Sequence, residues 1–330
     1  MKNNTLAEIA ARLLSAERIL LFPHVRADGD ALGSAVSLCA ALREKRRQAY
    51  VLLEDEIAEN LRFLMGDYCT TDCSAVGKPD VCVSVDCSDV DRFEKRRDVF
   101  FSADCKICID HHVTTGSFGD MNYIDPEAAA TGELIYELLV QMSAEITPFM
   151  ADALYAAIET DTGGFRYSNT TRRSHLITAA LFDSGLDSCR VCNEIYDSMR
   201  GEQLTLHAEA LSGMRTFAGG QANLACVTRE MLQNTGADMS ESEGIVEKLR
   251  SIRGIEISVL LKEEDENVIK VSMRAKSRGD VAVISQKFGG GGHKKAAGCT
   301  IRLPMEEACR QIIDAVEEEL EKECSQCAKE

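Results

Sequence analysis

The first 185 residues alternate mainly apolar runs with amphipathic stretches. Four runs are short enough to form one β-strand each: 18–24, 49–53, 80–87 and 105–112. Stretches of helical period accompany them at 29–47, 131–144, 147–164 and 172–185. Apolar strands that alternate with helices are typical of a parallel sheet covered by helices on both faces. The pattern therefore predicts an N-terminal α/β domain with a mostly parallel sheet.

The pattern changes after residue 200. A long helical stretch at 200–214 is followed by strand-like runs at 221–228, 256–264, 267–276 and 298–303. Helical patterns occur at 242–254 and 281–290, and a last helix closes the chain. This order predicts a smaller α+β domain built on a meander. The expected division is a first domain at 1–188, a helical linker at 189–215 and a second domain at 216–330.

Composition limits the classes of function. The chain has 330 residues, is 45% hydrophobic and carries a formal net charge of -17. Such acidity argues against a long nucleic-acid track, which normally needs a basic surface. It remains compatible with a small phosphorylated ligand, because bound metal ions can supply positive charge locally. Residues 1–22 resemble an amphipathic helix and a strand rather than a targeting signal, and no apolar run is long enough for a bilayer. A cytoplasmic protein without a membrane role is expected.

Cysteine is abundant, with 14 residues that include three C-x-x-C pairs, "CKIC" at 105–108, "CRVC" at 189–192 and "CSQC" at 324–327. Alternation along a strand would send the two cysteines of "CKIC" to opposite faces. Free thiols in a reducing compartment are the favoured interpretation. Structural zinc or a redox pair is the alternative.

Aspartate and histidine residues collect where the predicted strands and one helix end. In chain order they are His24, Asp28, Asp30, Asp86, Asp110, His111, His112 and Asp161. Open parallel sheets bind their ligands outside the carboxyl ends of the strands. A single aspartate at such a place is more often a helix N-cap. Clustered carboxylates would repel one another unless cations lie between them.

The types of these residues predict the kind of cation. Carboxylate and imidazole ligands suit Mn²⁺, Mg²⁺ or a similar divalent ion better than a structural zinc cage. One octahedral ion does not need so many ligands, so two ions are expected. Two ions about 3.5–4 Å apart, bridged by a carboxylate and a hydroxide, form a common site for phosphoryl hydrolysis.

Four segments resemble the four motifs of the DHH phosphoesterases: "HVRADGDALGS", "VSVDCSDVDR", "IDHHVT" and "AIETDTGGFRYSNT". "VSMRAK" and "DVAVISQKFGGGGHKKAAGC" resemble the DHH-associated C-terminal domain. The stand-alone two-domain length is similar to that of NrnA-type members of the family. The first motif departs from the usual pattern, with Ala27 where many members have proline and with a less usual Arg26. Neither change removes a metal ligand.

The resemblance implies a role for each motif residue. His24, Asp28 and Asp86 would hold one metal ion, and Asp30, Asp86, His111 and Asp161 the other. Mn²⁺ is favoured, with Mg²⁺ or Co²⁺ as alternatives. Asp86 would bridge the ions, and His112 would donate to the substrate phosphate in the transition state. Asp110 would orient one of the metal-ligating histidines without binding metal itself, or it is simply a buried turn carboxylate.

The resemblance also implies a substrate-binding role for the second domain. The predicted residues are Arg274, Lys276, Gly290, Gly291, Gly292 and His293, a positive island in an acidic chain. The loop does not fit a P-loop, because no lysine followed by serine or threonine completes that motif. Glycines without side chains would let backbone N–H groups approach a phosphate. A plain flexible turn is the alternative. The active site is expected in the cleft between the two domains.

The resulting functional hypothesis is hydrolysis of short RNA oligonucleotides to mononucleotides and of 3'-phosphoadenosine 5'-phosphate to AMP, by attack of a two-metal hydroxide on phosphorus. The expected partners are short RNA and small phosphorylated nucleotides rather than long duplexes, and the assembly could be a homodimer. One alternative is a cyclic-di-AMP or pApA phosphodiesterase of the same fold. Another, of a different class, is a non-catalytic nucleotide-sensing or RNA-binding protein.

Overall fold

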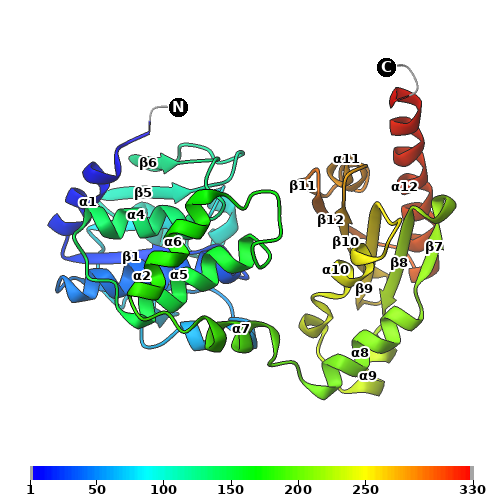
Figure 1. The fold of residues 1–330 in the computed structure, drawn as a ribbon, viewed down its shortest axis with the longest axis horizontal. Helices are drawn as coiled ribbons and strands as arrows, with labels where there is room; N and C mark the ends of the chain where they lie inside the picture. The colour runs from blue at the N-terminus through cyan, green and yellow to red at the C-terminus, as the bar shows by residue number, and fades with distance from the viewer. Residues whose placement is uncertain (1–2, 328–330) are drawn as a thin grey trace. The chain divides into compact units, whose positions relative to one another are not determined.

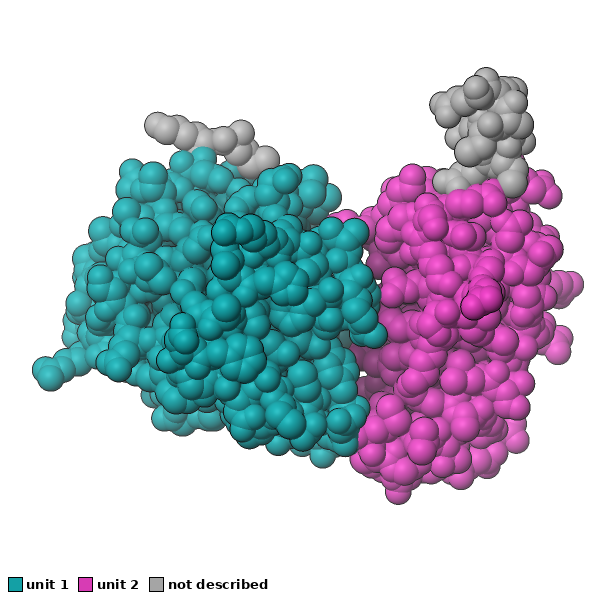
Figure 2. All heavy atoms as spheres, in the orientation of Figure 1, with its two compact units in different colours: residues 1–198 teal, residues 199–330 magenta. Residues whose placement is uncertain are grey.

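The computed structural model describes residues 3–327, with all their side chains except those at 94 and 323–327. The chain forms two compact units, residues 1–198 and 199–330, which Figure 2 shows in teal and magenta. Each unit has its own hydrophobic core. The predicted linker at 189–215 contains all but the first residue of α7 (Ser188–Tyr196) in the first unit, and α8 (Gly201–Ser212) in the second. Its exact boundaries stay a prediction.

The first unit is built on a six-stranded, fully parallel sheet with strand order β3-β2-β1-β4-β5-β6. The strands are β1 (Arg18–Phe22), β2 (Gln48–Leu52), β3 (Cys69–Thr70), β4 (Val81–Val85), β5 (Cys105–Asp110) and β6 (Met121–Ile124). The predicted α/β architecture is confirmed. The short edge strands β3 and β6 were not predicted, because so few half-buried residues leave no clear periodic pattern.

Helices cover both faces of this sheet (Figure 1). On one face, the core combines side chains of the strands with those of α1 (Leu6–Ser15), α2 (Gly29–Glu44), α4 (Thr131–Gln141), α5 (Pro148–Asp161), α6 (Arg172–Asp183) and α7. Helices α2 and α4 contact the strands, and α5 packs over these two helices. The other packs against η2 (Val90–Arg96) and α3 (Arg97–Ser102), whose Phe93 and Phe100 meet Phe22 of β1. A short 3-10 helix, η1 (Glu59–Leu64), follows β2. Burial on both sides explains why the strands are continuously apolar.

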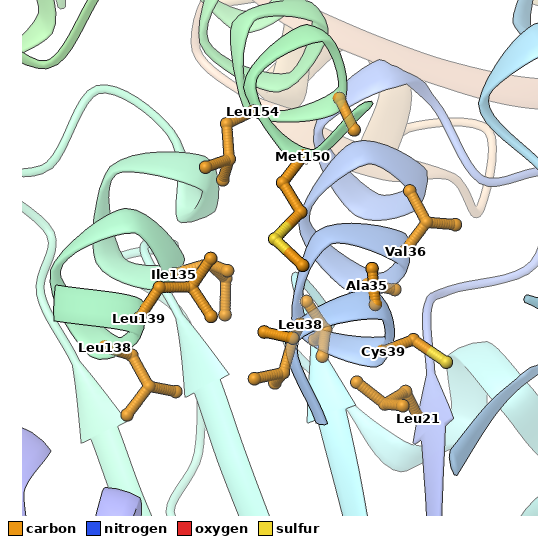
Figure 3. Packing of buried hydrophobic residues seen from close by; sticks show 14 of the residues in the cluster. Leu21, Ala35, Val36, Leu38, Cys39, Ile135, Leu138, Leu139, Met150 and Leu154 are labelled. Atoms are coloured by element: carbon orange, nitrogen blue, oxygen red, sulfur yellow. The ribbon is translucent and has the colours of Figure 1, made fainter. Parts of the chain in front are cut away.

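Helix α2 is buried from Gly29 to Leu42, and its core side chains lie between those of α4, α5 and β1 (Figure 3). A helix that is apolar on all sides is typical of such a central position. Small residues allow α2 and α5 to approach each other closely. A Cβ atom on Gly33 would lie 2.3 Å from the carbonyl oxygen of Ala153 in α5. The N-terminus of α2 is therefore fixed against its neighbours.

The order of the strands places a topological switch beside β1. The chain adds β2 on one side of β1 and β4 on the other. Ligands of open α/β sheets bind in the crevice at such a switch, outside the carboxyl ends of the strands. His24 follows β1, and Asp86 follows β4.

The strand predicted at 105–112 ends earlier, at Asp110. The Asp110 carboxylate accepts hydrogen bonds from the backbone N–H groups of His111 (2.8 Å) and His112 (3.3 Å). These N–H groups are therefore not available for the backbone hydrogen bonds that would extend the strand. The same contacts turn both histidines away from the strand direction.

The second unit holds a mixed six-stranded sheet with strand order β11-β12-β10-β9-β8-β7. Its strands are β7 (Arg215–Phe217), β8 (Ala222–Val227), β9 (Ile257–Asp265), β10 (Val268–Ala275), β11 (Gly291–His293) and β12 (Ala296–Ile301). Its other elements are α8, η3 (Ala218–Gly220), α9 (Arg229–Thr235), η4 (Met239–Ser242), α10 (Ile245–Ser251), α11 (Val281–Gln286) and α12 (Met305–Cys327).

Two details differ from a simple meander. The β8–β9 pair is parallel, because α9 and α10 form a crossover between these strands. The helix predicted at 281–290 ends at Gln286, and residues 291–293 form a strand instead. Within residues 3–327, every helix is too short or too polar to cross a membrane.

Cysteines of the first two C-x-x-C pairs occupy unlike environments. Cys105 and Cys108 are buried in β5, whereas Cys189 is exposed on α7. The "CSQC" pair lies outside the described side chains.

Candidate metal centre

His24, Asp28 and Asp86 form a first group of ligand-type side chains. His24 Nδ1 donates to the carbonyl oxygen of Val25 at 2.8 Å, which leaves Nε2 as the acceptor nitrogen. His24 Nε2 lies 3.5 Å from Asp28 Oδ2 and 3.8 Å from Asp86 Oδ2. Asp28 is also the N-cap of α2, through a 3.0 Å bond that its Oδ1 accepts from Ala31 N–H. The cap and the ligand group thus use different oxygens of one carboxylate.

Asp30, His111 and Asp161 form a second group. His111 Nδ1 donates to the carbonyl oxygen of Ala128 at 3.2 Å, so its Nε2 is again the acceptor. That nitrogen lies 3.8 Å from Asp30 Oδ2, 3.5 Å from Asp161 Oδ2 and 3.6 Å from Asp86 Oδ1. The structure therefore brings all six predicted metal ligands together, from α2, α5 and the ends of three strands.

Asp86 lies between the two groups. Its Oδ2 is near His24, and its Oδ1 is 3.6 Å from His111 and 3.7 Å from His112. The residue is only 2% exposed and has a φ of 55°, in the left-handed region that few residues adopt. Strained backbone of this kind persists where the surrounding structure holds it, often at functional sites. One buried carboxylate thus presents one oxygen to each group.

The charges of these carboxylates are not balanced by the side chains alone. Burial and the charges of Asp86 and Asp161 raise the pKa of Asp30 well above its usual value. Burial and the nearby Asp28 raise the pKa of Asp86. Burial and neighbouring aspartates raise the pKa of Asp161 to about 7. Cations bound among these groups would remove the repulsion.

The donor atoms of both groups fit divalent metal ions. Each group offers one imidazole nitrogen and two carboxylate oxygens within 4.8 Å of one another. Oxygen and imidazole donors suit Mn²⁺ and related ions, whereas none of the atoms in these groups is a thiolate. Both histidines already have their second ring nitrogen bonded to a backbone carbonyl, as metal-ligating histidines usually do.

Asp110 and His112 lie beside this centre. His112 Nδ1 and Asp110 Oδ1 are 2.7 Å apart, and Thr115 donates its hydroxyl to Asp110 Oδ2. Burial alone would lower the pKa of His112, but the hydrogen bond to Asp110 and the charge of Asp86 raise it to about 9. The Asp110 carboxylate therefore orients the ring of His112. The sequence had predicted that it would orient a metal-ligating histidine instead.

Several polar contacts of the centre were not predicted from the sequence. Thr131 donates to two of the aspartates, Ala128 accepts from His111, and Asn169 donates to the carbonyl oxygens of Ala129 and Asp161. Most of these contacts use backbone atoms, which the residue type does not reveal. One signal was available: the helix predicted at 131 is preceded by alanine, which cannot cap it.

The predicted substrate-binding residues lie in the second unit. Arg274 on β10 is opposite Ala296 on β12, and Ala296 is opposite His293 on β11. Opposite residues point to the same face, so Arg274 and His293 lie two strand spacings, or about 10 Å, apart. Arg274 Nε is 3.0 Å from Glu247 Oε1, and Lys276 donates to a main-chain carbonyl oxygen at 2.6 Å. These residues share one end of the sheet.

The glycine-rich loop is ordered by contacts of its own chain. A Cβ atom on Gly290 would lie 2.3 Å from the carbonyl oxygen of Gly298 and 2.5 Å from Ser285 Oγ. One on Gly292 would lie 2.5 Å from Ala297 Cα, whereas one on Gly291 would meet nothing within 4 Å. Internal packing therefore explains two of the three glycines. Open space remains beside Gly291, and also beside Gly289, the first glycine of the loop.

Comparisons with known proteins match both units. Residues 18–158 match the model of the DHH family, N-terminal domain, and residues 209–322 match the DHHA1 domain. The "Bifunctional oligoribonuclease and PAP phosphatase NrnA" of Thermus thermophilus is 32% identical over 306 residues, covering 92% of this chain and 90% of that protein. The protein of the same name from Bacillus subtilis is 28% identical over 304 residues, with 90% and 93% covered.

A solved structure has a similar fold over both units. It is an exopolyphosphatase-related protein from Bacteroides fragilis, 26% identical, with a TM-score of 0.90 and 95% of each chain covered. These likenesses extend over almost the whole chain rather than over one motif. The chain belongs to the DHH phosphoesterases that carry a DHHA1 domain, the family that includes the bifunctional oligoribonucleases and PAP phosphatases of the NrnA type.

Proposed function

We propose that this protein is a metal-dependent phosphoesterase that degrades short RNA oligonucleotides and removes the 3'-phosphate of 3'-phosphoadenosine 5'-phosphate. The main support is the position of Asp86, whose two oxygens are directed to two separate groups of ligand-type atoms. The names of the Thermus and Bacillus relatives support the substrate class. Hydrolysis of a phosphate ester is the chemistry that a two-ion centre of this kind favours.

The residues of the centre have distinct proposed tasks. His24, Asp28 and Asp86 would hold one divalent ion, and Asp30, Asp86, His111 and Asp161 the other. Two such ions, with Mn²⁺ the favoured species, would polarise the phosphoryl oxygens and supply the nucleophile. In His24 and His111, Nε2 is the nitrogen available to bind metal, because Nδ1 donates a hydrogen bond to a backbone carbonyl oxygen. Hydrogen bonds from neighbouring residues hold the Asp30 and Asp86 carboxylates, which would reduce the cost of reorganisation when ions bind.

His112 is proposed to bind the scissile phosphate. Asp110 engages its Nδ1 at 2.7 Å, so a phosphate oxygen would be contacted through Nε2. The same contact favours the protonated ring, which can donate a hydrogen bond to charge that develops on the phosphate. Asp110 would thereby act as the positioning residue for His112.

Hydrolysis assays on the full chain test this proposal. With Mn²⁺ present, the wild-type protein is expected to release mononucleotides from pApA and short RNA, and AMP from 3'-phosphoadenosine 5'-phosphate. Asp86→Ala should reduce turnover by more than about 100-fold, beyond the cost typical of losing a residue that only hydrogen-bonds a ligand. Asp183→Ala, at an exposed position on α6, is the matched control and should keep full activity.

The outcome of the same assays separates the alternatives. Activity on cyclic di-AMP or pApA alone would replace the proposed substrate range with that of a dinucleotide phosphodiesterase. Binding of these nucleotides without turnover would indicate a sensor. Near-wild-type turnover by Asp86→Ala would contradict the two-metal assignment.

A further inference from the structure

The N-terminus of helix α4 is not capped by the side chain of its own N-cap residue. Its N-cap residue is Ala130, whose methyl side chain cannot accept a hydrogen bond. Asp30, about one hundred residues earlier in the chain, accepts instead from the backbone N–H groups of Thr131 (2.7 Å, Oδ2) and Gly132 (2.8 Å, Oδ1). A proposed metal ligand is therefore also the cap of a helix from another part of the fold.

Thr131 contacts a second proposed ligand through its side chain. Its hydroxyl donates to Asp86 Oδ1 at 2.8 Å, and both residues are buried. Thr131 thus joins Asp30, which belongs to α2, to Asp86, which follows β4. The three residues are at most 2% exposed, so water does not compete for these bonds.

The residues just before Thr131 are linked to the other two ligands of the second group, to His111 directly and to Asp161 through Asn169. The Ala128 carbonyl oxygen accepts from His111, as described above. The Ala129 carbonyl oxygen accepts from the Asn169 amide at 3.0 Å, and that amide also donates to the Asp161 carbonyl oxygen at 3.1 Å. Residues 128–132 are consequently linked to Asp86 and to all three residues of the second group, in the case of Asp161 through Asn169.

These bonds leave the carboxylates able to bind a cation. A carboxylate oxygen can accept about two hydrogen bonds or ligands. Asp30 Oδ1 accepts from Gly132 N–H and from Ser34 Oγ, the latter at 3.0 Å. Asp30 Oδ2 accepts from Thr131 N–H and lies 3.8 Å from His111 Nε2, on the side of the ligand group. The positive end of the α4 dipole also offsets part of the negative charge of Asp30 before an ion binds.

We infer that Thr131 is a positioning residue that sets the geometry, and hence the metal affinity, of Asp30 and Asp86. The inference rests on the proposed metal site. Replacing Thr131 by valine would remove the bond to Asp86 and keep the shape of the side chain and the backbone bond to Asp30. Without this bond, the Asp86 carboxylate would be free to rotate out of the orientation in which one oxygen faces each group.

Direct Mn²⁺ binding tests this inference. Calorimetric titration of the metal-free full chain with Mn²⁺ should give a Kd about 10- to 100-fold higher for Thr131→Val than for the wild type, the range typical when a ligand loses its hydrogen-bond partner. Thr131→Ser, which keeps the hydroxyl, should restore most of the affinity. In hydrolysis assays, excess Mn²⁺ should restore much of the turnover of Thr131→Val.

Thr178→Val is the matched control, because the Thr178 hydroxyl donates at 2.8 Å to the Ser174 carbonyl oxygen of its own helix, α6. It should bind Mn²⁺ as the wild type does. If Thr131→Val does not fold in the absence of metal, Thr131→Ala takes its place in the comparison with Thr131→Ser. Wild-type Mn²⁺ affinity in a folded variant without the hydroxyl would overturn the inference alone. Failure of the wild type to bind Mn²⁺ would overturn the metal site itself.

Discussion

The side chains of the metal centre could be predicted from the sequence because their types and positions follow a physical rule. Aspartate and histidine at the carboxyl ends of parallel strands converge at one edge of the sheet. His24, Asp86 and His111 obey this rule, since each follows a strand. The residues that orient them could not be predicted in the same way. Their contacts are made by the carbonyl groups of Val25 and Ala128, and every residue has a carbonyl group.

A histidine outside the centre gives a prediction about pH and stability. His207 in α8 is buried, its Nε2 donates to the Glu241 carbonyl oxygen, and its Nδ1 accepts from Lys248 Nζ, both at 2.8 Å. Burial, with a contribution from the Lys248 charge, lowers the pKa of His207. Below about pH 6.5, His207 therefore binds a proton in the unfolded chain more readily than in the folded protein. This part of the stability is present above that pH and is lost as the pH falls.

Unfolding of the metal-free protein at about pH 7.5 and about pH 5.5 measures this effect, in the range where histidine titrates. The wild type should lose more stability on acidification than His207→Gln, which has no titratable group at this position. An equal pH dependence in the two proteins would show that His207 is not responsible.

The pattern of helices and strands was predicted well wherever an element was long and strongly apolar. Helix α2 and strands β1, β4 and β5 are such elements, and five of the six proposed metal ligands lie in them or within two residues of their ends. The apolar pattern is less informative where a single side chain overrides it. The Asp110 carboxylate ends β5 by accepting from the backbone of the next two residues. The glycine-rich loop likewise forms a strand because β12 offers it a pairing edge.

The contact between α2 and α5 predicts the effect of one small substitution. Gly33→Ala would place a Cβ atom 2.3 Å from the Ala153 carbonyl oxygen, so the two helices must separate. Overpacking of this kind typically costs roughly 1–3 kcal/mol of the free energy of unfolding. Gly116→Ala is the control, since its Cβ would meet nothing within 4 Å. Chemical denaturation of both variants measures the difference, and equal stabilities would show that α2 and α5 adjust without strain.

At the scale of the whole molecule, the sequence indicated two domains because two different patterns of strands and helices follow one another. The structure confirms a parallel sheet in the first unit and a second sheet in the other, which is mixed rather than the predicted meander because β8 and β9 are parallel. The residues proposed for chemistry belong to the first unit, and those proposed for substrate binding belong to the second. The sequence pattern says nothing of how the two sets cooperate.

Kinetics of His293→Ala test whether the second unit takes part in catalysis. His293 is exposed on β11, in the same row of the sheet as Arg274. If this row binds the substrate, the variant should raise KM for pApA and leave Mn²⁺ affinity unchanged, because the proposed metal ligands are all in the first unit. Thr300→Ala, at an exposed position on β12, serves as the control. Unchanged kinetics of His293→Ala would remove the loop from the proposed mechanism.

The number of Mn²⁺ ions bound per chain tests the central claim most directly. Equilibrium dialysis of the metal-free wild type against saturating Mn²⁺ should give two ions per chain, one for each group of ligands. Asp86→Asn should give fewer than two, because the replacement amide is neutral and only one of its side-chain atoms is an oxygen acceptor. A wild-type protein that binds a single ion, or none, would contradict a two-metal phosphoesterase centre bridged by Asp86.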